Sequence, residues 1–187
     1  MRAALREHAY LEGDFLLRSG QRSRYYLDKY RFETQPELLR ELGRRIVALV
    51  REHEPDATRL AAPELGAVTL AAAASLDSGL PFLIVRGSAK EYGTMNRIEG
   101  VFEPGERACL IEDVVTTAGA LIETLHAVRD AGLDVGTAIC VVDREQGGLE
   151  ALAAESVELR PIFRASELLE TAKSASASLV DADLEGT

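Results

Sequence analysis

Short apolar runs that alternate with segments of helical spacing are the feature that most limits how this chain can fold. Four such runs occur, at residues 60–63 (LAAP), 82–85 (FLIV), 108–114 (ACLIEDV) and 137–142 (TAICVV). Helical spacing follows three of them, over 65–77, 119–131 and 145–153. A last strand is expected over 157–162. Near-continuous apolar strands that alternate with helices are typical of a parallel sheet covered on both faces. The sequence therefore predicts an α/β fold of the doubly wound kind, with a mainly parallel sheet.

The first part of the chain has a different pattern, which predicts a small α+β hood ahead of the sheet. Residues 1–12 have helical spacing, and 15–17 and 25–27 indicate two short strands joined by a turn-prone segment. Pro36 then opens a helix whose apolar residues share one face. These residues are Leu38, Leu39, Leu42, Ile46, Leu49 and Val50.

Length and composition place the protein among ordinary globular domains. At 187 residues and 47% hydrophobic content, the chain is long enough for one full domain with a sizeable core. We expect this domain over residues 1–170, with the hood as residues 1–35. A flexible tail is expected over 171–187, where small and polar residues predominate.

Charge, cysteine spacing and apolar segment length limit the classes of function. A net charge of -10 argues against nucleic-acid binding. The longest uncharged apolar stretch, 65–76, is too short to span a bilayer, and the N-terminus shows no apolar signal segment. Cys109 and Cys140 lie singly in apolar runs without metal-ligand spacing, so buried, reduced thiols are expected. We therefore expect a cytoplasmic protein that binds neither nucleic acid nor a membrane.

The segment EDVVTTAGA, residues 112–120, combines acids, hydroxyls and small residues at a predicted strand-to-helix junction. Thr116 to Gly119 carry little side chain, so their backbone N–H groups can approach an anion ahead of a helix N-terminus. Thr116 and Thr117 add hydroxyl donors, and a phosphate monoester would fit there. Glu112 and Asp113 would repel that phosphate, but they can accept hydrogen bonds from sugar hydroxyls or hold a metal through water. The segment therefore predicts a site for a phosphorylated sugar.

An ordinary strand-to-helix turn capped by threonine is the alternative explanation of this segment. A cap does not require two adjacent acids at the end of an apolar strand, where at least one would face the interior of the sheet. Because burial of an unpaired carboxylate is unfavourable, the pattern favours a binding site. Three further polar segments, 63–66, 86–100 and 143–148, follow other predicted strands. Ligands of such sheets bind beyond the carboxyl ends of the strands.

Residues 110–132, LIEDVVTTAGALIETLHAVRDAG, resemble the phosphoribosyl diphosphate (PRPP) motif of the type I phosphoribosyltransferases. The segments SGQRSRYYLDKYRF, RGSAKEYG and VVDREQGG are similar to those of orotate phosphoribosyltransferases, especially archaeal-type short forms. The likeness covers residues of about 15–165. It implies a pentosyltransferase that moves phosphoribosyl from PRPP to orotate, giving orotidine 5′-monophosphate and diphosphate in pyrimidine (UMP) biosynthesis. It also implies Mg²⁺ carried by PRPP, with no direct protein ligand.

The resemblance further implies which residues bind PRPP. The motif residues would bind its phosphoribosyl part: Glu112, Asp113, Val114, Val115, Thr116, Thr117, Ala118, Gly119 and Ala120. Arg86, Lys90 and Tyr92 would reach the diphosphate, often in the site of the neighbouring subunit, so a homodimer is expected. Lys90 and Asp113 are the expected catalytic residues. A solvated surface loop is the alternative, and it is preferred for the other charged residues of this loop, Glu91, Arg97 and Glu99.

Two other segments receive implied roles. Backbone amides of 63–66 would bind diphosphate, with the Glu64 side chain turned away or meeting magnesium. Orotate would be contacted by Thr116, Arg144 and Arg18. Arg144, at the end of a predicted strand, is placed to pair a carboxylate bidentately. Its spacing fits a pair with Asp143 or Glu145 equally well.

Four residues depart from the family pattern. Gly87 replaces a loop lysine, Met95 a glycine, Ala118 a glycine, and Ala120 a serine or threonine. We expect a negative φ at Ala118, since only then is its side chain tolerated. Two alternatives stay open: a phosphoribosyltransferase for another base, and a non-catalytic PRPP-binding regulatory protein. A carboxylate partner for Arg144 argues against the first, and the reduced set of loop cations favours the second.

Overall fold

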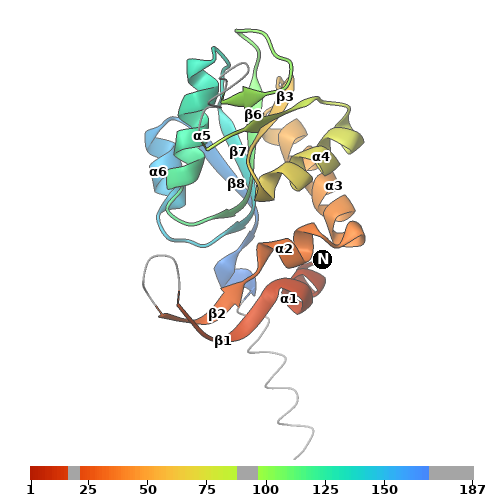
Figure 1. Cartoon of the computed structure of the whole chain (residues 1–187), viewed down its shortest axis with the longest axis vertical. Helices are drawn as coiled ribbons and strands as arrows, with labels where there is room; N and C mark the ends of the chain where they lie inside the picture. The colour runs from red at the N-terminus through yellow and green to blue at the C-terminus, as the bar shows by residue number, and fades with distance from the viewer. Residues whose placement is uncertain (17–21, 88–96, 169–187) are drawn as a thin grey trace, which may run out of the picture.

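Residues 1–16, 22–87 and 97–168 are described by the computed structural model in Figure 1. Within these ranges, a six-stranded sheet in the order β5-β4-β3-β6-β7-β8 forms the centre. Its strands are β3 (Arg59–Pro63), β4 (Phe82–Val85), β5 (Ile98–Glu99), β6 (Ala108–Val115), β7 (Thr137–Asp143) and β8 (Glu158–Arg164). Neighbouring strands are parallel except β4 and β5, which pair antiparallel. The predicted fold class, α/β with a mainly parallel sheet, is confirmed.

Helices cover both faces of this sheet (Figure 1). The helices α3 (Pro36–His53) and α4 (Gly66–Ser78) lie on one face, and α5 (Gly119–Asp130) and α6 (Gly148–Ala154) on the other. Successive side chains of a strand point to opposite faces. Cys109 of β6 therefore packs in the α3–α4 layer, whereas Leu110 packs in the α5–α6 layer. Cys109 and Cys140 are free and buried, as expected, and burial raises the pKa of both thiols.

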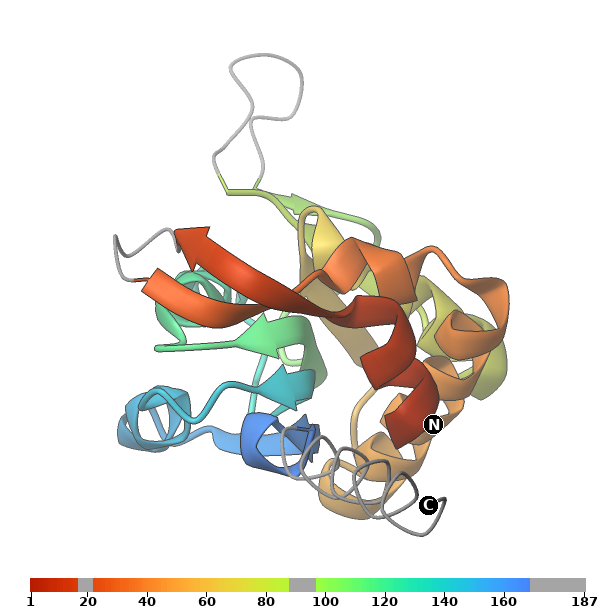
Figure 2. The same ribbon diagram turned by 90° about the horizontal axis from the view of Figure 1, so that it is seen from below.

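The hood consists of α1 (Arg2–Ala9), β1 (Tyr10–Leu16), β2 (Arg22–Leu27) and α2 (Lys29–Glu33). β1 and β2 form an antiparallel ribbon, which Figure 2 shows in front of the sheet when the molecule is seen from below. The predicted helix over 1–12 is wrong beyond Ala9, because the chain from Tyr10 onward pairs with β2. The sequence pattern predicts neither α2 nor β5, since each is too short to show a repeat.

The hood is fixed to the sheet by apolar burial and by one ion pair. Leu5 and Phe32 are fully buried in the core that α3 and α4 share with the sheet. Lys29 of α2 donates a hydrogen bond to Asp113 of β6 at 2.6 Å. These contacts place the hood over the carboxyl ends of the central strands. Among the helices of the described ranges, none is long and apolar enough to cross a bilayer.

Leu110 offers a test of the core. Its side chain is fully buried on β6, so truncation to alanine leaves a cavity and removes apolar contacts. We expect Leu110→Ala to lower the free energy of unfolding by about 2–5 kcal/mol, measured by urea denaturation. Leu76→Ala is the control, because Leu76 is 90% exposed, and it should change stability by less than about 0.5 kcal/mol. Equal losses in the two variants would contradict the core described here.

Candidate active site

The predicted site segments meet at one edge of the sheet. β4, β3, β6 and β7 are adjacent and parallel, so the loops that leave their carboxyl ends lie side by side. The backbone N–H of Arg144 donates to the carbonyl of Val115 at 2.8 Å. A Cβ on Gly148 would lie 2.6 Å from the carbonyl oxygen of Thr116. The loops after β6 and β7 are therefore in direct contact, as the sequence predicts.

The start of α5 has the features of an anion seat. The helix begins at Gly119 and spans twelve residues, and no side chain caps its first turn. Thr116, Thr117, Gly119 and Ala120 are exposed, and a Cβ on Gly119 would meet no atom within 4 Å. The uncapped N–H groups and the helix dipole favour an anion at this position. The alternative of a turn capped by a threonine side chain is not what the structure has.

Ala118 contradicts the prediction of a negative φ. Its φ is 64° and its ψ is 8°, in the left-handed region. The turn from β6 into α5 requires this conformation, although it costs an alanine roughly 1–2 kcal/mol. The Ala118 side chain is 5% exposed and packs in the α5–α6 core, which offsets part of the cost. A side chain is therefore tolerated here with a positive φ.

Glu112 and Asp113 are buried at the carboxyl end of β6, with 8% and 2% of their surface exposed. Oε1 of Glu112 accepts a hydrogen bond from the Asp113 N–H at 3.0 Å. Burial, and then the charge of Asp113, raises the pKa of the Glu112 carboxyl. Oδ1 of Asp113 accepts from the Val114 N–H at 2.6 Å, and Oδ2 accepts from Nζ of Lys29 at 2.6 Å. The acid pair is thus held by backbone amides and by one cation from the hood.

Lys29 is the neighbour of the acids that the sequence pattern misses. Its segment, YYLDKYRF, lies within the region of family resemblance, and lysine is scarce in this chain. Neither signal indicates that residue 29 reaches residue 113, because the contact joins two elements that are 84 positions apart. The Lys29 side chain is 35% exposed, so it is only partly buried beside the acids.

The loop after β4 is tied to the 63–66 segment at its base. Oε1 of Glu64 accepts from the Gly87 N–H at 3.1 Å, and Oε2 lies 3.7 Å from Nη1 of Arg86. The Glu64 side chain is therefore turned toward this loop. Arg97, expected to be an ordinary surface charge, donates from Nε to the Arg86 carbonyl at 3.3 Å and closes the base of the loop. The predicted site residues Lys90 and Tyr92, and also Met95, lie outside the described residues.

The loop after β7 places Arg144 beside the end of β6. Asp143 is buried and accepts from the Glu145 N–H at 2.8 Å. Two hydrogen bonds from Ser166 to Glu145 lower the pKa of that carboxyl. A cavity of about 350 Å³ borders this loop, lined by Asp143, Glu145, Gly147, Gly148, Leu149, Glu150 and Arg164. The predicted pairing of Arg144 with a substrate carboxylate stays a prediction, and Arg18 lies outside the described residues.

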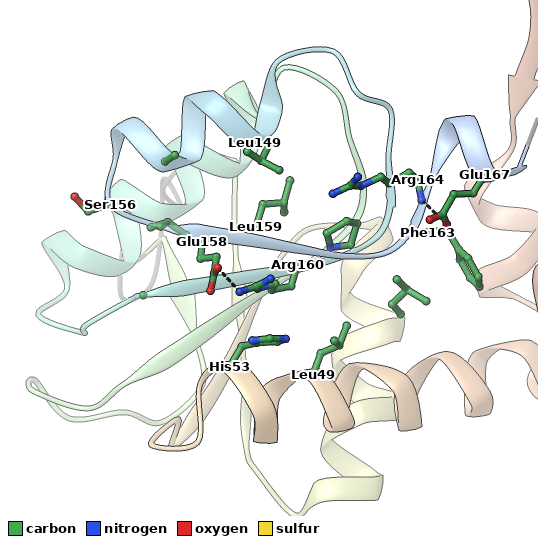
Figure 3. Close-up of a pocket in the computed structure, with 15 residues that line it drawn as sticks. Leu49, His53, Leu149, Ser156, Glu158, Leu159, Arg160, Phe163, Arg164 and Glu167 are labelled. Atoms are coloured by element: carbon green, nitrogen blue, oxygen red, sulfur yellow. Dashed lines mark hydrogen bonds and ion pairs between the residues drawn. The ribbon is translucent and has the colours of Figure 1, made fainter.

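A larger groove adjoins this cavity and shares Leu149 and Arg164 with it. It has a volume of about 750 Å³ and runs along β8, where Leu49 and His53 of α3 face the strand (Figure 3). Arg160 and Glu158, on β8, form an ion pair at its wall. None of the predicted site residues within the described ranges lines this groove. Cavity size alone therefore does not mark the site.

The described residues do not form a ready-made metal centre. Among them, no group of three or more His, Cys, Asp or Glu side chains has the arrangement of a metal site. Asp113 already accepts hydrogen bonds at both oxygens, from Lys29 and from a backbone amide. The two carboxylates suit a sugar diol better than a directly bound cation, because sugar hydroxyl groups can donate hydrogen bonds to their remaining lone pairs.

The parallel sheet, with an uncapped helix start and a buried acid pair at the end of a central strand, has the fold of the type I phosphoribosyltransferases, as comparison with known proteins shows. No protein family model matches the chain. Orotate phosphoribosyltransferase of Methanocella arvoryzae is 50% identical over 158 residues, which cover 84% of this chain and 88% of that relative. The structure of the orotate phosphoribosyltransferase from Aeropyrum pernix matches with a TM-score of 0.84 and 28% identity, over 92% of this chain and 97% of that one.

A further solved structure, of the Mycobacterium tuberculosis orotate phosphoribosyltransferase in complex with PRPP, matches with a TM-score of 0.76 and 28% identity. The match covers 89% of this chain and 95% of the chain in that structure. The chain belongs to the orotate phosphoribosyltransferase family. The predicted resemblance is confirmed.

Gly148 provides a test of the contact between the two loops. A Cβ there would lie 2.5 Å from Cγ1 of Val115 and 2.6 Å from the carbonyl oxygen of Thr116, so backbone must shift. We expect Gly148→Ala to lower the free energy of unfolding by about 1–3 kcal/mol, measured by urea denaturation. In Gly87→Ala the nearest atom would be 3.9 Å away, and the change should stay below about 0.5 kcal/mol. A fully stable Gly148→Ala protein would show that the loops are farther apart.

Proposed function

We propose that this protein is a pentosyltransferase that transfers phosphoribosyl from PRPP to orotate, giving orotidine 5′-monophosphate and diphosphate for pyrimidine (UMP) synthesis. One observation carries the proposal: a buried acid pair and an uncapped helix N-terminus lie within one strand-to-helix junction. An anion and a diol presented by the same small molecule match this pair of sites. Membership of the orotate phosphoribosyltransferase family supports the assignment.

The 5′-phosphate binds at the start of α5. Backbone N–H groups of residues 116–120 and the hydroxyls of Thr116 and Thr117 donate hydrogen bonds to its oxygens. Ala120 supplies no hydroxyl, so its backbone alone contributes. The preceding Val114 and Val115 fix this loop, because Val115 is buried at the end of β6.

The ribose hydroxyls donate hydrogen bonds to Glu112 and Asp113. Bond cleavage at the anomeric carbon spreads positive charge over the sugar ring, and a nearby carboxylate stabilises that charge. The ring nitrogen of orotate forms the new bond while the bond to diphosphate breaks, and the proton of that ring N–H passes to the released diphosphate or to water. Catalysis then depends on positioning and on fixed charges, without a protein nucleophile.

The leaving diphosphate is bound by the 63–66 segment and by the loop after β4. Backbone amides near Gly66 donate to it, and Arg86, Lys90 and Tyr92 add charge and a hydroxyl. Magnesium carried by PRPP supplies further positive charge to the diphosphate when the substrate is bound. Closure of the loop excludes water, which would otherwise react at the same carbon.

Orotate is recognised through its carboxylate, which pairs with Arg144, and through Thr116 and Arg18. A base without a carboxylate would lack the group that Arg144 is proposed to bind, and this favours orotate over other bases. The homodimer, in which Lys90 serves the neighbouring site, rests on family resemblance, and the cytoplasmic location rests on the isolated thiols Cys109 and Cys140. Both stay predictions.

An absorbance assay tests the function. The protein is incubated with PRPP, Mg²⁺ and orotate, and the loss of orotate absorbance is followed. We expect turnover with orotate and none with uracil or adenine, because only orotate offers a carboxylate to Arg144. Binding of PRPP without loss of orotate would instead indicate a regulatory protein, and turnover with another base would reassign the substrate.

Replacement of Lys90 should lower kcat while leaving the affinity for orotate nearly unchanged. We expect Lys90→Ala to lower kcat by about 10²–10³-fold, because charge on the leaving diphosphate loses a stabilising cation. The affinity for orotate should stay within about twofold, since Lys90 does not contact the base. Lys173→Ala, in the predicted tail, is the matched control and should leave kcat unchanged. An unaltered kcat in Lys90→Ala would remove Lys90 from the mechanism.

A further inference from the structure

Lys29 lies where three parts of the candidate site meet. Its Nζ is 2.6 Å from Oδ2 of Asp113 at the end of β6. A Cβ on Gly66, at the start of α4, would lie 2.9 Å from the same Nζ and 1.8 Å from Oδ2 of Asp113. The ammonium is therefore packed between the hood, the 63–66 segment and the acid pair. Gly66 is the residue that leaves room for this contact.

Glu33, one helical turn after Lys29 on α2, completes the cluster. Its side chain is buried, with 3% exposed, although glutamate is seldom buried without a partner. Burial first, and then the charge and proximity of Asp113, raise the pKa of the Glu33 carboxyl. Oε1 of Glu33 is buried without a hydrogen-bond partner among the described residues. A buried carboxyl beside another carboxyl is favoured in its protonated form, so the hood presents both a cation and a proton-bearing carboxyl to the same aspartate.

The physical need for this cluster follows from the burial of the acid pair. Glu112 and Asp113 are adjacent and almost completely buried, so their charges are poorly solvated and close to each other. A buried charge without a partner is strongly unfavourable, and a nearby cation favours the ionised form. Nothing else in the described ranges forms an ion pair with Asp113. Lys29 is therefore what offsets the charge of Asp113.

We propose that Lys29 and Glu33 are positioning residues of the transferase site, which hold the Asp113 side chain in place for the ribose of the phosphoribosyl donor. The proposal rests on the function proposed above and assigns the hood a part in the reaction. Neither residue needs to touch the substrate. Lys29 acts through Oδ2 of Asp113, and the protonated Glu33 carboxyl offers a hydrogen-bond donor to the same carboxylate.

The protonation of Glu33 gives the proposal a pH signature. Burial first, and then the negative charge of Asp113, raises the pKa of Glu33 to about 8. Lys29 opposes this shift, and Asp28 adds to it. The helices α1, α3 and α4 also pack on α2. Their titratable side chains are Arg2, Arg6, Glu7 and His8 of α1, Glu37, Arg40, Glu41, Arg44, Arg45, Arg51, Glu52 and His53 of α3, and Asp77 of α4. None of these is among the main causes of the raised pKa of Glu33. Glu33 is thus neutral below about pH 8 and adds a further buried charge beside Asp113 above it.

A double-mutant cycle tests whether Lys29 acts through Asp113. The four proteins are the parent, Lys29→Met, Asp113→Asn and the double variant, and kcat/KM for PRPP is measured at pH 7. We expect Lys29→Met to lower kcat/KM at least tenfold in the parent and less than threefold in the Asp113→Asn background, because the charge to be offset is then gone. Arg31→Met, on the same helix and exposed, is the control and should have no effect. Equal losses in both backgrounds would overturn the proposal.

A pH profile of Glu33→Gln gives an independent result that does not depend on the folding of Lys29→Met. Glutamine keeps the size of the side chain and cannot ionise. In the parent, kcat/KM for PRPP should fall as the pH rises through about 8, the value to which the Glu33 pKa is raised. In Glu33→Gln the ratio of activity at pH 9 to activity at pH 7 should be at least fivefold higher. Superimposable profiles for parent and variant would contradict the role of Glu33.

The same proteins separate this proposal from the proposed function. If the parent binds PRPP but consumes no orotate, the transferase assignment fails. Calorimetric affinities for Mg²⁺-loaded PRPP then replace kcat/KM in the same cycle. Non-additive losses of affinity would still support Lys29 as the residue that positions Asp113, and additive losses would exclude it.

Discussion

The structure depends on how two adjacent carboxylates are kept at the buried end of a central strand. β6 lies between β3 and β7, and both faces of the sheet are covered, so its last side chains have little access to water. Desolvation of a carboxylate costs several kcal/mol unless hydrogen bonds or a cation offset it. Backbone amides at Asp113 and Val114 and the ammonium of Lys29 provide that compensation. The site is possible only because these partners are in place before any ligand binds.

One junction thereby provides two opposite kinds of recognition. The acids accept hydrogen bonds and favour positive charge, whereas the start of α5, a few residues later, donates hydrogen bonds and favours an anion. They do not neutralise each other, because the acids lie on the strand and the amides at the helix terminus. Ala118 accepts an unfavourable left-handed conformation to make this sharp turn. This separation of the acid pair from the anion-binding amides suits a ligand with a phosphate at one end and a diol nearby.

The hood has a larger part than its size suggests. Its apolar residues Leu5 and Phe32 join the main core, so α2 is fixed relative to β6. Lys29 and Glu33 are thus presented to Asp113 by packing that involves neither residue. The wide groove along β8, by contrast, is large but has no such convergence of charged groups with the predicted site residues. The candidate active site is therefore distinguished from the groove along β8 by its cluster of charged side chains, and not by cavity volume.

Much of the architecture could be predicted from periodicity and from the residues at strand ends. The apolar runs gave the parallel strands β3, β4, β6, β7 and β8, and the motif 112–120 gave the candidate phosphate seat. Short elements such as α2 and β5 escape because they contain too few residues to show a repeat. The prediction of a negative φ at Ala118 was wrong, because the turn between β6 and α5 decides this angle and the preference of alanine does not.

By itself, the sequence determined the alternation of strands and helices and the chemistry at the end of each strand, because both follow from local residue order. Only the tertiary structure decided that Lys29 and Glu33 reach Asp113 and that Glu64 turns to the base of the next loop. These contacts join residues far apart in the chain. The contacts of Lys29 and Glu33 depend on how the hood packs over the sheet, and that of Glu64 depends on the pairing of β3 with β4, which no local pattern records.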